Sequence, residues 1–274
     1  MPAISTNTAA NAAVRYLNIN SAQETSALSK LSSGSRITSA SDDAAGLAIS
    51  TRISSDITTL QQAATNASQA SSILQTADGG ASNISDILAR MKSLASESAS
   101  GTVTDSSRTY INSEFSQLSS EIDSIATGTR YSSQSLLDGS SSFASGVSVL
   151  VGSSASDTIT ITLSSLTASS LGVSSLDVST QSGANTALTT LDSAINSVSA
   201  ARASIGAQES RFNFSADSIS TQTQNLQSAN SAITDVDIAS EQATLSSAEV
   251  KTQAAVSAET AANQMPQYLL KLLG

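Results

Sequence analysis

The chain has 274 residues with a formal net charge of −10, and it contains neither His nor Cys. It therefore lacks the commonest general base, the commonest thiol nucleophile and the usual zinc ligands, which disfavours an enzyme, a bound cofactor or a metal site. The acidic balance argues against nucleic acid or an anionic membrane as a partner.

The supply of bulky side chains predicts long, thin helices rather than a wide core. Aromatic residues make up 3% of the chain, and Ala supplies much of its 39% hydrophobic share. A wide core needs larger side chains to fill its volume. No stretch offers the roughly 18 apolar residues that span a bilayer. The N-terminal residues also lack the basic and apolar parts of a secretory signal peptide, so we expect the general secretory route not to be used.

The first 33 residues are predicted to form an amphipathic helix. Its bulky apolar residues share one stripe: Val14, Leu17, Leu28 and Leu31. A thin helix of this kind is marginal in isolation. We expect it to become ordered against neighbouring helices.

Residues 31–50, LSSGSRITSASDDAAGLAIS, place two adjacent aspartates before an apolar helical pattern. Neighbouring residues on a helix point about 100° apart, so Asp42 and Asp43 are poorly placed to grip a metal or a substrate together. Ser and Asp are favoured at helix starts, where they accept hydrogen bonds from free N–H groups. We therefore interpret Ser41, Asp42 and Asp43 as a helix cap, with a contact to a cation such as Arg36 or Arg52.

A heptad-like seam follows from residue 42 to about residue 99. Such a seam indicates a helix packed along its length against another one. Gly79 and Gly80 are interpreted as a weak point inside this helix rather than its end, and residues 107–127 predict a shorter helix. The larger seam residues are Ile53, Ile57, Leu60, Leu74, Ile84 and Leu88.

The middle of the chain, residues 129–183, is rich in Ser, Thr and Gly. Two alternating runs, residues 147–151 and 158–163, are joined by a short polar connector. This pattern predicts a small β-hairpin between the helical parts of the chain.

A second seam occupies the C-terminal third. Its bulky residues fall seven positions apart, which predicts coiled-coil-like packing against the first seam. They are Leu191, Val198, Ile205, Phe212, Ile219 and Leu226. The last 40 residues carry a thinner stripe of Ala248, Ala255, Ala262 and Leu269, and Leu245 and Leu270 are further bulky residues of the same segment. The fold expected is a long antiparallel helical hairpin with both termini paired.

Several segments together resemble bacterial flagellin, and in particular the short flagellins of alphaproteobacteria. Besides residues 31–50, the matching segments are ILQTADGGASNISDILARMKSLA at 73–95, SIGAQESRFNF at 204–214, AITDVDIASEQA at 232–243 and AANQMPQYLLKLLG at 261–274. The resemblance covers both ends, about three quarters of the chain. The large outer domains of the family are replaced by the short middle segment, so the chain resembles a minimal flagellin.

The resemblance implies a division into layers of a filament. Residues 1–35 and 234–274 would form an inner layer of paired terminal helices. Residues 42–128 and 184–233 would form the surrounding long-helix layer, with 129–183 as the hairpin segment. The seams would hold one subunit together, while the terminal residues, from Val14 to Leu31 and from Leu245 to Leu270, would pack between subunits.

The resemblance also implies the location of the protein and its binding partners. Its partners would be other copies of itself or other flagellins, the flagellar type III export apparatus, an export chaperone, and the hook-associated and cap proteins. It would be secreted into an extracellular filament used for swimming. Arg90 aligns with an arginine bound by the animal innate receptor for flagellin, and Ser93 replaces the acidic residue three positions on. The alternative is a solvated surface arginine.

Two other functions stay open at this point. A hook–filament junction protein would have similar ends but would be present in few copies. A secreted adhesin would use the coiled coil to bind a host protein and would stay a monomer or small bundle at high concentration.

Overall fold

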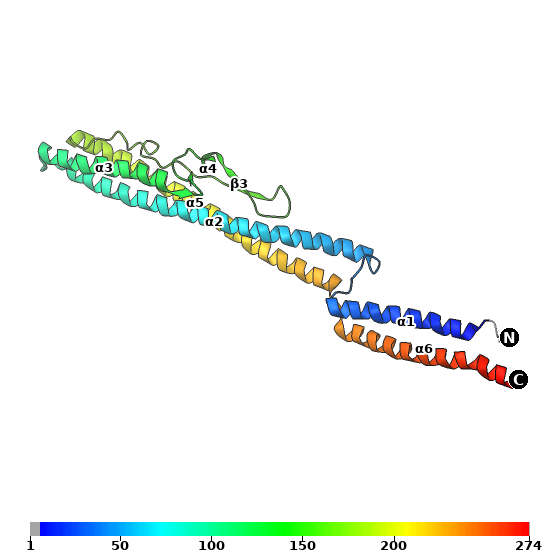
Figure 1. The fold of residues 1–274 in the computed structure, drawn as a ribbon. Helices are drawn as coiled ribbons and strands as arrows, with labels where there is room; N and C mark the ends of the chain where they lie inside the picture. The colour runs from blue at the N-terminus through cyan, green and yellow to red at the C-terminus, as the bar shows by residue number, and fades with distance from the viewer. Residues whose placement is uncertain (1–5, 274) are drawn as a thin grey trace. The chain divides into compact units, whose positions relative to one another are not determined.

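The computed structural model describes residues 6–273, with side chains for residues 6–265. In chain order, the elements are α1 (Thr8–Ser33), α2 (Ala44–Ala99), α3 (Asp105–Gly128), β1 (Arg130–Tyr131), β2 (Gln134–Ser135), α4 (Ser142–Ser145), β3 (Val147–Leu150), β4 (Thr158–Ile161), α5 (Gln181–Thr234) and α6 (Ile238–Leu273) (Figure 1). The prediction of a mainly helical chain with paired termini and a small β-hairpin is confirmed.

The chain divides into two compact units, which are described separately. The terminal unit comprises residues 6–55 and 225–273 and contains the α1–α6 pair. The long-helix unit comprises residues 56–224 and contains α3, the β-rich segment and most of α2 and α5. No helix among residues 6–273 has the length and apolarity that crossing a bilayer requires.

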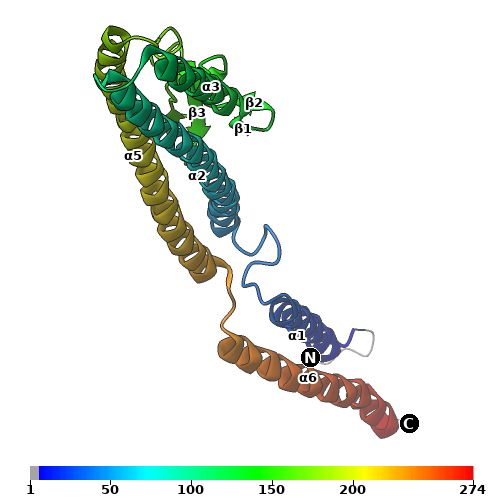
Figure 2. The ribbon, with the colours of Figure 1, turned by 90° about the vertical axis from the view of Figure 1, so that its left-hand side faces the viewer.

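Within the long-helix unit, α2 and α5 run antiparallel. Three side-chain contacts join them: Gln75 Nε2 to Glu209 Oε1 at 2.8 Å, Arg202 Nε to Asp78 Oδ1 at 2.8 Å, and Lys92 Nζ to Asp192 Oδ1 at 2.5 Å. Positions rise along α2 as they fall along α5, which fixes the direction. The two helices also lie side by side in Figures 1 and 2.

Most residues of the two predicted seams are buried. Those covered are Leu60, Leu74, Ile84, Leu88, Leu191, Val198, Ile205, Phe212 and Ile219. Ile53, Ile57 and Leu226, which lie toward the ends of the seams, are only half-buried. The repeat of 3.5 residues keeps bulky side chains on one side of each long helix, so the core is narrow and runs along the helices.

The predicted continuation of the first long helix through Gly79 and Gly80 is confirmed, because α2 is unbroken from Ala44 to Ala99. The two glycines differ in their surroundings. A Cβ added at Gly79 would meet nothing within 4 Å, whereas one added at Gly80 would lie 2.9 Å from Leu137 Cδ1 and would contact Thr129 Oγ1. Gly80 therefore allows the segment after α3 to approach the backbone of α2 closely.

Two antiparallel hairpins form the β-rich segment. In the first, the turn between β1 and β2 places Ser132 and Ser133 at φ 47° and 68°, a region that non-glycine residues rarely occupy. In the second, β3 pairs with β4 from Val147↔Ile161 to Leu150↔Thr158. The observed strands lie inside the predicted runs.

The second predicted strand ends early because its backbone finds a side-chain partner. The N–H of Thr162 donates to Gln208 Oε1 at 2.9 Å, and Gln208 Nε2 donates to the carbonyl of Thr162 at 3.0 Å. The amide of Gln208 thus pairs with Thr162 as a neighbouring strand would. This contact attaches the β3–β4 hairpin to α5, and Gln208 is buried beneath it.

Candidate assembly surface

The α1–α6 pair packs through small side chains. The residues buried along it are Ala10, Ala13 and Ala27 on α1, and Leu245, Ala248, Ala255 and Ala262 on α6. Small residues let two helices approach closely, but each buried methyl or methylene contributes only about 0.8 kcal/mol. The pair therefore has a thin core of its own.

The terminal residues predicted to pack between subunits divide into two groups. Leu245, Ala255 and Ala262 are covered within the chain, because they belong to the α6 stripe that faces α1. Val14 and Leu28 are instead 39% and 58% exposed. The two alanines are small enough for close packing against α1, and packing of all three residues between subunits stays a prediction.

Leu17 and Leu31 of the same predicted group are half-buried on α1. The predictions for Leu269 and Leu270 lie outside the residues whose side chains are described.

Hydrogen bonds join the two helices near both ends of the pair. At one end, Asn7 Oδ1 accepts from the N–H of Ala10 at 3.1 Å, and Asn7 Nδ2 donates to the carbonyl of Ala262 at 2.8 Å. Asn7 is therefore both the cap of α1 and a link to α6.

At the other end of the pair, the two connecting segments run antiparallel. The N–H of Arg36 donates to the carbonyl of Thr234 at 2.6 Å, and the N–H of Val236 donates to that of Gly34 at 3.1 Å. Gly34 ends α1 at φ 69°, which glycine adopts without a steric penalty.

Exposed apolar side chains gather on the terminal unit. Among the described side chains, nine of the eleven large exposed ones belong to it: Val14, Tyr16, Ile19, Leu28, Ile49, Ile238, Val250, Val256 and Met265. The other two, Tyr110 and Phe214, belong to the long-helix unit. Such a concentration on thin helices is typical of a surface that another protein covers.

The two aspartates before α2 have separate roles. Asp43 Oδ1 accepts from the N–H of Gly46 at 2.8 Å and so caps α2. Asp42 Oδ2 instead accepts from the N–H of Ser39 at 2.9 Å and from the N–H and hydroxyl of Thr38, both at 3.0 Å. These hydrogen bonds, that from the Ser39 backbone foremost, lower the pKa of Asp42 to about 2.

The interpretation of all three residues as one helix cap is therefore corrected. Ser41 shares a hydrogen bond with the hydroxyl of Ser39 at 2.7 Å, so it and Asp42 hold the preceding turn. Among the described ion pairs, none includes Asp42 or Asp43. Arg36 donates from Nη2 to the carbonyl of Ile233 at 2.7 Å, and Arg52 is exposed.

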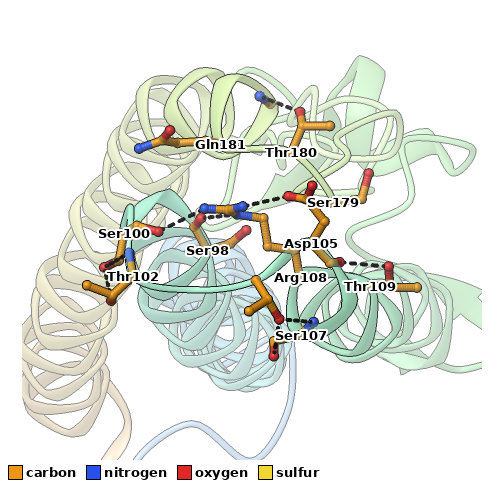
Figure 3. A network of polar contacts seen from close by, with 12 residues as sticks. Ser98, Ser100, Thr102, Asp105, Ser107, Arg108, Thr109, Ser179, Thr180 and Gln181 are labelled. Carbon is orange, nitrogen blue, oxygen red and sulfur yellow. Dashed lines mark hydrogen bonds and ion pairs between the residues drawn. The ribbon is translucent and has the colours of Figure 1, made fainter.

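A buried arginine, Arg108, binds the turn from α2 to α3 (Figure 3). This role was not predicted from the sequence. Arg108 donates from Nε to the carbonyl of Ser98 and from Nη2 to that of Ser100, both at 2.8 Å, and it pairs through Nη1 with Asp105 at 2.7 Å. A cation on the last carbonyls of a helix complements its dipole. The signal for this role was an Arg placed four residues after the cap residue Thr104.

Arg90, the predicted receptor-facing residue, lies on the surface of α2. It forms an ion pair with Glu114 of α3, with Nη2 and Nε at 2.6 and 3.0 Å from Oε1, and its side chain is 54% exposed. Exposed pairs of this kind contribute little to stability. Among the described residues, no group of three or more His, Cys, Asp and Glu side chains could hold a metal ion.

Comparisons with known proteins match nearly the whole chain. Residues 4–142 match the family described as "Bacterial flagellin N-terminal helical region", and residues 188–273 match "Bacterial flagellin C-terminal helical region". The chain is 35% identical to a flagellin of Halalkalibacterium halodurans, over 98% of this chain and 99% of that protein. It is also 35% identical to the flagellar filament 30.7 kDa core protein of Treponema maltophilum, over 94% and 95% of the two chains.

A solved structure agrees with these sequence matches. The crystal structure of Bacillus cereus flagellin superposes with a TM-score of 0.52 at 29% identity. The match covers 61% of this chain and 94% of that chain. The long-helix architecture is therefore shared with a solved protein of related sequence.

Proposed function

The chain belongs to the bacterial flagellin family, and we propose that it assembles with copies of itself into the flagellar filament used for swimming. The observation that carries this proposal is the α1–α6 pair, which has a thin core inside and exposed apolar side chains outside. Neighbouring copies can cover those side chains.

The mechanism follows from the geometry of repeated contacts. When two different surfaces of one molecule meet and the rotation does not close a ring, the copies build an open helical filament. The terminal helices bury little area within one chain, so contacts with several neighbours offset the entropy lost when they become ordered.

The same proposal extends to export and to other partners. The subunit would leave the cell through the flagellar type III apparatus with the help of an export chaperone, and it would meet hook-associated and cap proteins at the ends of an extracellular filament. A chain with no Cys has no disulfide to form or break during such a passage.

Seeded polymerisation tests the proposed function. Concentrated full-length protein is mixed with short filament fragments and examined by electron microscopy. Long filaments are expected. Persistent monomers or small bundles at high concentration would contradict the proposal and agree with an adhesin, and a copy number of only a few per cell would indicate a junction protein.

Added salt is expected to speed polymerisation. Residues 56–224 carry 14 acidic and 6 basic side chains, a formal charge of −8, while the rest of the chain carries −2. The long-helix units of neighbouring subunits therefore repel one another, and raising the ionic strength from about 0.01 to 0.15 M shortens the range of that repulsion from about 30 to 8 Å. Light scattering at several salt concentrations measures the rate, and slower growth with salt would refute the prediction.

A further inference from the structure

One flank of the α1–α6 pair is hollowed into an open, polar groove of about 540 Å³. Gln23 and Lys30 line it from α1, and Thr244 and Lys251 line it from α6. Glu241 belongs to the same lining, so two lysines and one glutamate give the lining residues one positive charge in excess. We refer to these five residues as the lysine groove.

The opposite flank of the same pair carries a negative charge and exposed apolar side chains. Leu28 and Glu249 each precede a groove lysine by two residues, which turns them about 200° away from the groove around their helices. Val14 and Val256 lie whole heptads from Leu28 and Glu249, so they share that side. All four side chains are exposed, and we refer to them as the glutamate flank.

One chain cannot bring these two surfaces together, because they face away from each other on one pair of helices. A second copy can. We propose that the lysine groove of one copy receives the glutamate flank of the next, with Glu249 of the incoming copy placed against Lys251 and Lys30. The contact deepens the proposed function and rests on it.

Charge and exposed apolar side chains both favour a second copy as the occupant. An incoming carboxylate meets the net positive charge of the groove, and complementary charges fix register and suppress wrong partners. The apolar residues beside Glu249 cover surface on both copies. Because the contact joins two different flanks, a pair of copies still presents one free groove and one free flank, and the array grows without closing in pairs.

Charge reversal on α6 tests the contact. Lys251→Glu and Glu249→Lys should each raise the critical concentration for polymerisation by roughly tenfold. The double variant, which exchanges the two charges, should return it to within about threefold of the original value. Neither position has a charged residue three or four places away on the helix, so the variants should keep their helicity, and circular dichroism checks this.

Matched controls change the same net charge elsewhere. Arg211→Glu and Glu121→Lys alter exposed residues of the long-helix unit and should shift the critical concentration by less than about threefold. If a reversal lowers the helicity, Lys251→Gln and Glu249→Gln remove each charge alone and should still weaken assembly.

The outcomes separate this contact from the function on which it rests. If the unchanged protein forms no filaments, the proposed function fails. If it forms filaments while both reversals assemble normally, or while the double variant assembles no better than the singles, the groove is not the receiving surface. Weakening by inorganic phosphate with no effect of Glu249→Lys would identify the groove as an anion site and overturn the contact.

Discussion

Removal of residues 240–274 is expected to leave a soluble, helical monomer that forms no filaments. The truncation deletes nearly all of α6, so the buried alanines of α1 lose their cover and the surface loses Val250, Val256 and Met265. The long-helix unit keeps its own core, because the buried hydrophobic residues of α2 and α5 lie between residues 60 and 219. The truncated chain should therefore still fold its long-helix unit, but it should not assemble.

Electron microscopy and circular dichroism measure the two properties on the same sample. We expect a strong helical signal, a monomer by sedimentation, and no filaments even with seeds. A matched control deletes only residue 274, which should leave polymerisation intact. Long filaments from the larger truncation would show that the terminal pair is not needed for assembly.

Substitution of two adjacent glycines by alanine is expected to change stability in opposite directions. Gly79→Ala should stabilise the monomer by about 1 kcal/mol, because alanine favours the helix and its methyl group meets nothing within 4 Å. Gly80→Ala should destabilise it by about 1–3 kcal/mol, since its methyl group would overlap Leu137 and Thr129. The Thr129 hydroxyl is held by the carbonyl of Ile125 at 2.7 Å, so it cannot easily move aside.

Urea unfolding of the monomer, followed by circular dichroism, gives the two free energies. Each variant is the control for the other, because both make the same chemical change in the same turn of α2. Equal effects of the two substitutions would mean that the segment after α3 does not press on Gly80.

The long helices could be predicted because bulky residues mark them at a fixed period. Ile205, Phe212 and Ile219 belong to a run of bulky residues that repeats every seven positions, and a phase held over so many repeats is typical of a helix packed along its length against another. The β3–β4 hairpin was also predictable, since alternation in residues 147–151 and 158–163 is specific to strands.

The partners of the small residues could not be predicted in the same way. An alanine such as Ala255 can pack against a helix of its own chain or of another, and the sequence pattern is the same for both. Asp42 and Asp43 show a similar limit, because both are good capping residues and only the path of the backbone decides which helix or turn each one serves. The buried role of Arg108 depends on a turn that brings the end of α2 to it.

The α1–α6 pair is fastened near both of its ends, by Asn7 to Ala262 at one and by the Arg36–Thr234 and Gly34–Val236 backbone bonds at the other. Neither helix can separate from its partner from either end until the hydrogen bonds at that end break. Asn7 both caps the start of α1 and donates a hydrogen bond to α6, so unfolding of the first turn of α1 also breaks the contact that holds this end of α6. Two segments more than two hundred residues apart therefore gain or lose their structure as a single cooperative body.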